Sequence, residues 1–241
     1  MRRRWALLGG AILLGAAGWA AAVGLRQGGT SLPARAESEK PVLMLLTSLP
    51  LVFAERFGLE GGGSPALTAL QSRYHVVPIA VADAANLKQG RMLFMAHALA
   101  QPAEALVDLD RWVRSGGHAV LLADPMLEWE STRPPGDGLR PAPMFPDTGL
   151  LGHWGLQLDA PDERGAVERR LGGTAIMADS PGALSGRRCE IGRDGFVAVC
   201  RIGKGLATII ADADFLAPEA FAAQPENADA LLRELDRTEP K

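Results

Sequence analysis

The chain has few of the residues that usually mark an active site. Its 241 residues include two cysteines, one tyrosine and four histidines, and aromatic residues make up 5% of the sequence. With so few aromatic rings, an aromatic-lined sugar cleft is not expected. The sequence has no HExxH, GxxxxGK[ST] or GxGxxG motif, and neither cysteine stands in a GxCxG-type elbow. We therefore predict no catalytic residue, no cofactor and no resident metal.

Positive charge is scarce beyond the N-terminus. Four of the 25 basic residues lie at or before residue 26, so residues 27–241 carry 21 basic and 28 acidic side chains. The resulting net charge of about −7 argues against nucleic acid or anionic lipid as the main partner of this part of the chain.

Charge of either sign is absent from one long stretch, Trp5–Leu25. Its 21 apolar or small residues, at ~1.5 Å per residue, match the ~30 Å hydrocarbon core of a bilayer. The arginines Arg2–Arg4 before it favour a cytoplasmic N-terminus. We expect residues 1–26 to form a retained signal anchor, a single-pass transmembrane helix of a bacterial inner membrane. Cleavage after Ala22 or Ala36 is the alternative, and both interpretations place the remaining chain in the periplasm.

Composition divides the exported chain into three parts. Gln27–Lys40 is polar, has no apolar period and is predicted to be a linker. Residues 41–217 are expected to form an α/β domain, and residues 218–241 a C-terminal helix and tail. About 200 residues from Pro41 onward suffice for one domain with a full core.

Apolar runs and helix signals alternate through the first half of the domain. The runs typical of strands are Val42–Leu51, His75–Val81, Arg91–Ala98 and His118–Asp124. Ser64 and Pro65 indicate the start of one helix, and a second helix is bounded by Pro102 and by Gly116-Gly117. This order predicts right-handed crossovers and a mainly parallel sheet, with helices on both faces in a three-layer arrangement. Pro78 suggests that its strand lies at an edge.

The last third of the domain changes to short strands separated by turns. The strand-like pieces are Gly173–Ala178, Arg188–Gly192, Phe196–Ile202 and Leu206–Asp212. Turn residues at Asp194-Gly195 and Gly203-Lys204-Gly205 predict an antiparallel meander of these pieces. Pro225–Asp236 is predicted to be a terminal helix that packs on the sheet. The predicted fold class is therefore α/β with a mixed sheet.

Three aspartates follow apolar runs of this sheet. Asp124 ends the run LLAD, and Asp212 and Asp214 end IIADAD. Ligands of doubly wound sheets bind at the carboxyl ends of the strands, and carboxylate oxygens are suitable ligands for a divalent cation. The simpler interpretation is that these aspartates cap the turns or helices that follow them. We keep the three as candidate binding residues without assigning a metal.

The Pro- and Gly-rich stretch Pro125–Pro146 is predicted to be a long loop. Loops of this length in a compact domain are usually functional or disordered. We expect Trp129 and Phe145, together with Leu139 and Met144, to offer an apolar contact to a partner.

The two cysteines stand on either side of a predicted hairpin turn. A two-residue turn at Asp194-Gly195 places Cys189 directly opposite Cys200, as a hydrogen-bonded pair with Cα atoms ~5.5 Å apart. In the oxidising periplasm this pair could form a disulfide, and two buried free thiols are the alternative.

Three stretches together resemble a known family: Leu109–Pro125, Leu150–Pro161 and Arg201–Leu216. Their Gly-Gly turn, Asp-Pro strand end and Gly-basic-Gly turn before Asp-x-Asp-Phe are similar to the exported domain of the ABC-type uncharacterised transport system auxiliary family, which is related to a gliding-motility auxiliary protein. The resemblance covers roughly Pro41–Leu216. It implies a flavodoxin-like or class I glutamine amidotransferase-like fold without the amidotransferase nucleophile. It also implies a protein partner at the inner membrane, among the components of an ABC-type transporter.

Two functions are expected from these patterns. The first is a non-enzymatic, membrane-tethered periplasmic binding or scaffolding module, as an auxiliary component of an ABC-type transport system. The alternative is a periplasmic divalent-cation-dependent hydrolase that uses Asp124, Asp212 and Asp214.

Overall fold

The structure is a computed structural model that describes residues 32–53, 55 and 63–240. Its elements, in chain order, are η1 (Glu37–Glu39), β1 (Val42–Thr47), α2 (Pro65–Arg73), β2 (His75–Pro78), α3 (Ala84–Leu87), β3 (Met92–Ala96), α4 (Ala103–Arg114), β4 (His118–Leu122), α5 (Leu150–Trp154), β5 (Leu156–Asp159), β6 (Ala166–Leu171), β7 (Thr174–Asp179), β8 (Ala183–Gly186), β9 (Glu190–Ile191), β10 (Val197–Ile202), β11 (Gly205–Ile210), η2 (Asp214–Leu216), α6 (Pro218–Ala223) and α7 (Pro225–Thr238).

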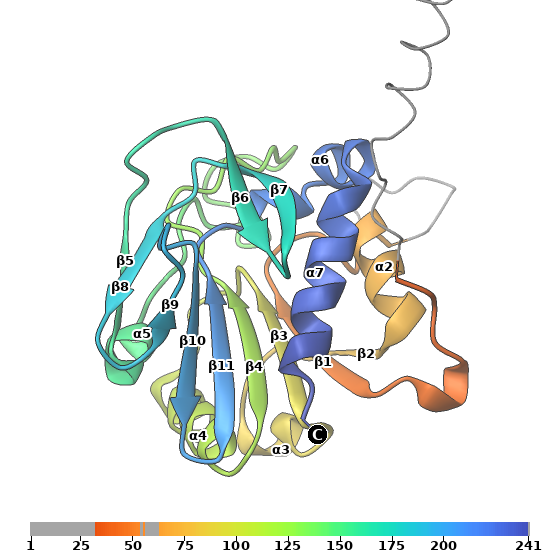
Figure 1. The fold of residues 1–241 in the computed structure, drawn as a ribbon, viewed down its shortest axis with the longest axis vertical. Helices are drawn as coiled ribbons and strands as arrows, with labels where there is room; N and C mark the ends of the chain where they lie inside the picture. The colour runs from red at the N-terminus through yellow and green to blue at the C-terminus, as the bar shows by residue number, and fades with distance from the viewer. Residues whose placement is uncertain (1–31, 54, 56–62, 241) are drawn as a thin grey trace, which may run out of the picture. The chain divides into compact units, whose positions relative to one another are not determined.

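Seven strands of the described chain form one mixed sheet in the order β2-β1-β3-β4-β11-β10-β9 (Figure 1). The pairs from β2 to β11 are parallel, and β10 runs antiparallel to both β11 and β9. The predicted α/β class with a mixed sheet is confirmed. Strand β2 lies at the edge, as Pro78 predicted, because proline cannot donate a backbone hydrogen bond to a further strand.

Helices cover both faces of this sheet, so the domain has three layers. One face is covered by α2, α6 and α7. Their residues Leu70, Phe221 and Leu231, respectively, share a core with Phe94 of β3. On the other face α4 and α5 bury Leu109 against Leu93. Neighbouring residues of β3 contribute to opposite cores because successive strand side chains point to opposite faces. Figure 1 shows α2 and α7 on one side of the strands and α4 on the other.

Two helices begin or end where the sequence indicates. The Ser64 hydroxyl accepts a hydrogen bond from the Leu67 amide at 3.1 Å and caps α2. Helix α4 ends at Arg114, and Gly116, which follows the C-cap residue Ser115, adopts a φ of 113° that other residues rarely reach. At Gly117 a Cβ atom would lie 2.4 Å from the Trp112 ring, so the chain turns into β4 through a position that only glycine fits.

The antiparallel part of the sheet is smaller than the sequence suggested. The predicted strand Gly173–Ala178 corresponds to β7, which pairs with β6 in a separate two-stranded hairpin rather than in the meander. Strands β5 and β8 form another separate pair. The β6–β7 hairpin exposes alternate residues, including Glu168 and Arg170, and therefore fits a surface position better than a buried sheet. It stands at the end of the sheet where the parallel strands finish (Figure 1).

The compact unit begins at Leu32 rather than at Pro41, the predicted domain boundary. The Arg35 amide donates a hydrogen bond to the Ser72 carbonyl at 2.9 Å, and the Leu32 amide donates to Asp229 Oδ1 at 3.2 Å. Part of the predicted linker 27–40 is therefore packed against α2 and α7. The opposite end of the predicted domain shows no boundary either, because Leu231 and Leu235 of α7 are buried in the core.

No helix within the described residues has the length and apolar character needed to cross a bilayer. The anchor predicted for residues 1–26 lies outside the described part of the chain.

Candidate functional site

The structure brings Asp124, Asp212 and Asp214 together as one buried group, which we call the aspartate cluster. Asp124 follows β4 by two residues, and the other two aspartates follow β11. These strands are parallel neighbours, so their carboxyl ends meet at the same edge of the sheet. One carboxylate oxygen from each residue lies within 4.8 Å of the others.

Each aspartate also organises the backbone around it. Asp124 accepts a hydrogen bond at each oxygen, from the amides of Met126 and Ala213, both at 2.8 Å. The first contact shapes the turn after β4, and the second connects this turn to the end of β11. Asp124 therefore has the capping role that the sequence suggested as the simpler interpretation.

The other two members of the cluster connect more distant segments. Asp212 accepts from the amides of Asp214 at 2.6 Å and Asp179 at 3.0 Å, and so connects the end of β11 to the β6–β7 hairpin. Asp214 Oδ2 accepts from the amide of Glu128 at 2.8 Å and connects the turn to the Pro-rich loop. Asp214 Oδ1 is buried and has no hydrogen-bond partner among the described residues.

Burial raises the pKa values of all three carboxyl groups, because it disfavours their charged forms. The pKa of Asp124 rises to about 6, although the surrounding backbone amides oppose the change. Burial, and then the charges of Asp124 and Asp214, raise the pKa of Asp212 well above its ordinary value. Burial and the charge of Asp124 raise the pKa of Asp214 to about 8. The cluster therefore retains protons at neutral pH.

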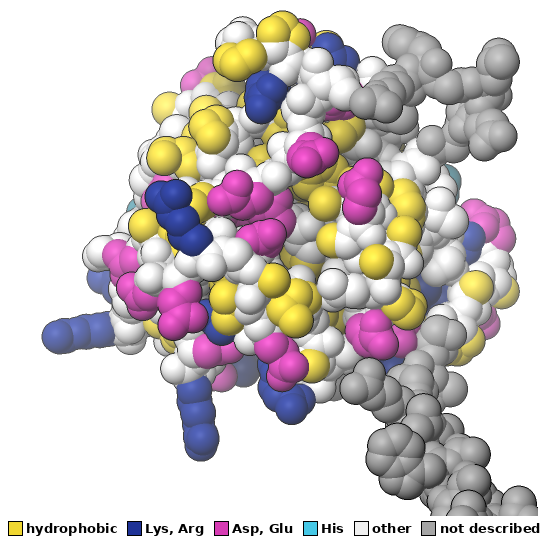
Figure 2. Space-filling view, turned by 90° about the horizontal axis from the view of Figure 1, so that it is seen from above, with side chains coloured by type: hydrophobic (Ala, Val, Ile, Leu, Met, Phe, Trp, Pro, Cys, Tyr) yellow, Lys and Arg dark blue, Asp and Glu magenta, His cyan; other side chains and the backbone are white. Residues whose placement is uncertain are grey.

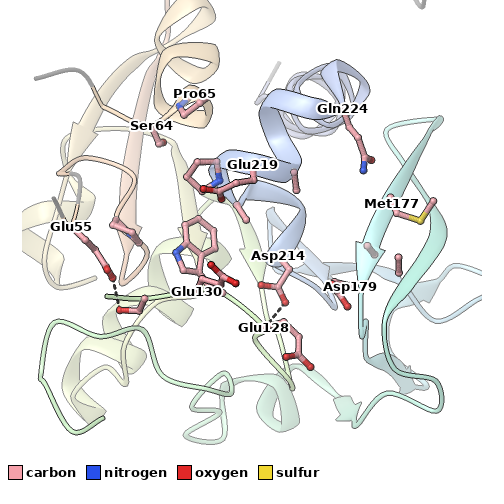
Figure 3. A pocket seen from close by; sticks show the side chains of 18 of the residues that line it. Glu55, Ser64, Pro65, Glu128, Glu130, Met177, Asp179, Asp214, Glu219 and Gln224 are labelled. Atoms are coloured by element: carbon pink, nitrogen blue, oxygen red, sulfur yellow. Dashed lines mark hydrogen bonds between the residues drawn. The ribbon is translucent and has the colours of Figure 1, made fainter. Parts of the chain in front are cut away.

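A cavity of about 820 Å³ opens beside Asp214, and we call it the acidic pocket. Six carboxylic acids line it: Glu55, Glu128, Glu130, Asp179, Asp214 and Glu219. None of the described residues that line it is Lys, Arg or His. Figure 2 looks onto this end of the domain and shows acidic side chains around a hollow, and Figure 3 shows them in the pocket wall.

The pocket wall comes from segments that are far apart in the chain. The Pro-rich loop contributes Glu128–Thr132, and β7 contributes Met177–Asp179. Asp214 stands at the start of η2, and Ala217–Ala220 belong to α6 and the residue before it. Ser64 and Pro65 complete this side from the start of α2 (Figure 3). Asp214 is the one pocket acid that the sequence singled out; no motif marks the other five, because neither spacing nor composition relates the segments that carry them.

Glu55 already has partners within the protein. Its carboxylate accepts hydrogen bonds from the Ser131 hydroxyl at 2.7 Å and from the Thr132 amide at 2.8 Å. Burial opposes its ionisation, but these bonds outweigh that effect and lower the pKa of Glu55. Glu55 thus holds the Pro-rich loop in place. Its carboxylate is therefore less available to a ligand than the other acids of the pocket.

The two apolar loop residues that the sequence singled out lie in different places. Trp129 is 8% exposed, lines the acidic pocket and packs into the core on the α7 side of the sheet. Phe145 packs against the core on the other side, where its ring meets His97 edge-on at 6.4 Å. The structure therefore joins Trp129, but not Phe145, to Asp214. Leu139 and Met144 are exposed at 69% and 60% and lie outside the pocket.

Cys189 and Cys200 form a disulfide in the structure. The strand register is the one expected from the turn, since Ala198 pairs with Ile191. The separation differs, because the Cα atoms are 4.3 Å apart, a distance typical of a pair without mutual backbone hydrogen bonds. The loop is closed by a hydrogen bond from the Gly192 amide to the Val197 carbonyl, which shifts the hydrogen-bonding pattern by one residue.

Comparison with known proteins finds solved structures of similar fold but no matching sequence family. No family model matches the chain, and no curated protein matches it. Exo-beta-1,4-mannosidase Op5Man5 from Opitutaceae bacterium strain TAV5 is 12% identical over 83% of this chain and 36% of its own, with a TM-score of 0.49. Cytoplasmic Protein STM3548 from Salmonella typhimurium is 12% identical over 83% of this chain and 100% of its own, with a TM-score of 0.51. The mmIFT52 N-terminal domain is 12% identical over 80% of this chain and 96% of its own, with a TM-score of 0.52.

This chain thus spans about a third of the mannosidase and nearly the whole of the other two chains. Likeness at 12% identity concerns the fold alone.

Proposed function

We propose that this protein is a non-enzymatic binding module whose acidic pocket holds a positively charged segment of a protein partner. The observation that carries the proposal is the lining of the pocket, where six carboxylic acids meet no basic side chain among the described lining residues. Such a surface attracts cationic partners and repels anionic ones. The apolar part of the wall, which includes Trp129 and Met177, suits the aliphatic portions of a peptide.

The hydrogen bonding of the aspartate cluster favours binding over catalysis. Five of its six carboxylate oxygens accept a hydrogen bond from a backbone amide. These bonds stabilise the backbone after β4 and β11 and the segments that contact it. A general acid or base must instead reach a substrate proton in a suitable geometry.

The proposed setting is the periplasmic side of a bacterial inner membrane. Residues 5–25 would tether the domain there, and the partner would be a component of an ABC-type transport system, as the family resemblance suggests. A flavodoxin-like or amidotransferase-like fold is part of the same proposal. It is supported by the strand order β2-β1-β3-β4-β11, which follows the flavodoxin-like pattern of 2-1-3-4-5.

Peptide binding to the full-length protein in detergent tests the pocket. Labelled peptides of equal length that carry lysine, glutamate or serine at alternate positions would be compared by fluorescence anisotropy. We expect the lysine peptide alone to bind, with an affinity that falls as salt is added. Replacing Glu130 and Glu219 by Gln should weaken binding several-fold, while Glu168→Gln on the exposed face of β6 serves as the matched control. Equal binding of all three peptides would contradict the proposal.

The second candidate function is a divalent-cation-dependent hydrolase, because the carboxylate oxygens of Asp124, Asp212 and Asp214 approach within 4.8 Å. Oxygen ligands of this kind fit Mg²⁺, Ca²⁺ or Mn²⁺. Calorimetric titration with each ion separates the candidates. Tight binding that Asp212→Ala abolishes would favour the hydrolase, whereas the binding module requires no such ion.

A further inference from the structure

One strand that borders the acidic pocket has an unpaired edge. Within the described part of the chain, β7 pairs with β6 alone, in a separate two-stranded sheet. Three of its residues line the pocket: Met177, Ala178 and Asp179. The side chains of Met177 and Ala178 point to opposite faces of the hairpin, yet both line the pocket. The edge of β7 therefore lies at the pocket wall, where Figure 3 shows Met177 and Asp179.

The hydrogen bonds around the hairpin show which backbone groups of β7 point away from β6. The Ser180 amide donates across the hairpin to the Gly165 carbonyl at 2.9 Å. The Asp179 amide points the other way and donates to Asp212 Oδ2 at 3.0 Å. Backbone groups of an antiparallel pair alternate in direction from one residue to the next, so the amide and carbonyl of Met177 also point away from β6. Neither group has a hydrogen-bond partner among the described residues.

An unpaired strand edge can accept an extended peptide as an additional strand. The Asp179 amide is already occupied, so the free part of this edge is Ala175–Met177. The pocket beside it has acidic side chains and no basic ones among its described lining residues, which favours a basic peptide. The other edge of the hairpin differs, because residues 167–171 of β6 lie outside the pocket and include two arginines.

We infer that the basic segment of the partner binds in an extended conformation and adds a third strand to the β6–β7 hairpin, through hydrogen bonds to the amide and carbonyl of Met177. Side chains of an added strand alternate between two faces, so basic residues at every second position share one face. Met177 and Asp179 also share a face of β7, and a basic side chain on that face would lie beside the Asp179 carboxylate. This inference rests on the proposed function of the pocket and adds the conformation of the ligand and the strand with which it pairs.

Two proline variants, one on each edge of the hairpin, test this inference with the alternating lysine peptide and the full-length protein in detergent. Met177→Pro removes the outward amide of β7 but no hydrogen bond between β6 and β7, and we expect the peptide to bind about tenfold more weakly. Glu168→Pro is the matched control, because Glu168 pairs with Met177 and its amide points out of the opposite edge. It should bind the peptide as Glu168→Gln does. Met177→Ala keeps the amide and measures the contribution of the side chain alone, and circular dichroism and unfolding temperatures verify that each variant folds.

Methylation of the peptide backbone tests the same hydrogen bonds from the side of the ligand. One lysine peptide would carry N-methyl groups on its lysine residues, and a second would carry them on the intervening residues. In an added strand only one of these two sets of amides points toward β7. We therefore expect one methylated peptide to lose about tenfold in affinity and the other to bind as the unmethylated peptide does.

The outcomes separate this inference from the proposed function. If both methylated peptides bind as the unmethylated one does, and Met177→Pro binds as the wild type does, the added strand is wrong while the acidic pocket still binds a basic segment. Equal losses for both methylated peptides, or for both proline variants, would also contradict pairing with the edge of β7. If no lysine peptide binds, both proposals are wrong.

Discussion

The domain holds two groups of charged side chains that are neutralised in different ways. One is an ion-pair network of Arg35, Arg73, Asp236 and Glu239. In it Arg73 pairs with Asp236 at 2.7 Å, and Arg35 pairs with Glu239 at 2.6 Å. The other is the aspartate cluster, in which burial and neighbouring carboxylates raise the pKa values and protons reduce the charge.

This difference separates a structural role from the proposed binding role. The ion-pair network contains two basic and two acidic residues, and the Tyr74 hydroxyl adds a hydrogen bond to Asp236 at 2.7 Å. It joins the start of the domain to α2 and α7 and has no need of a ligand. The aspartate cluster borders a pocket that has acidic side chains and no basic ones among its described lining residues. The proposed cationic partner would supply positive charge there.

The largest effect should come from breaking the ion-pair network. Arg73→Ala removes the ion pair with Asp236 and the hydrogen bond to the Pro33 carbonyl. Because the Arg73 side chain is 9% exposed, we expect the free energy of unfolding to fall by about 4 kcal/mol. Urea denaturation in detergent measures the change. The control is Arg111→Ala, whose side chain is 70% exposed in its pair with Asp108, and a similar loss there would show that burial does not explain the effect.

A rise in pH should destabilise the aspartate cluster by a somewhat smaller amount. The unfolded chain releases the aspartate protons near pH 4, while the folded protein holds them up to about pH 6 for Asp124 and about pH 8 for Asp214. Stability is therefore greatest at low pH and is lost as the pH rises through the folded values. We expect a loss of about 3 kcal/mol between pH 6 and pH 9. Asp214→Asn should reduce this slope, and an unchanged slope would show that the cluster does not retain its protons.

Removal of the disulfide should have an effect that is independent of both charged groups. Cys189 and Cys200 are 11 residues apart, and a crosslink over so short a loop contributes about 2 kcal/mol. Replacing both by Ala should lower the unfolding temperature without altering the pH dependence of stability. Mass spectrometry of the untreated protein after thiol alkylation checks the premise, because a mass shift for two alkylated thiols would show that the bond is absent.

The smallest effect concerns the end of α2 that borders the pocket. Ser64→Ala removes the hydrogen bond that the Ser64 hydroxyl accepts from the Leu67 amide and should destabilise the protein by about 1 kcal/mol. Since no charge is lost, the affinity for a lysine peptide should hardly change. Ser64→Asp, which keeps an acceptor at the cap, should restore stability, and failure to do so would argue against capping as the cause.

Local chemistry in the sequence was enough to determine much of the fold. Apolar runs mark β1, β3 and β4, Ser64 caps the start of α2, and Gly116 stands just after the end of α4. These signals work because they depend on backbone conformation and on burial within a few residues. Sequence reasoning kept Asp124 and Asp212 as candidates because both follow apolar runs. Their meeting depends on the parallel pairing of β4 with β11, which the sequence analysis did not predict.

Only the tertiary structure decided which distant segments meet. Arg35 and Asp236 pair across 201 positions of the chain, so residues expected in a linker belong to the domain. The pairing of β7 with β6 could not be predicted, because the local alternation of side chains does not specify a partner strand. The acidic pocket likewise depends on a loop, a hairpin and α6 arriving together. Pairing and packing of this kind depend on long-range complementarity of shape and charge, which a single sequence contains but does not display.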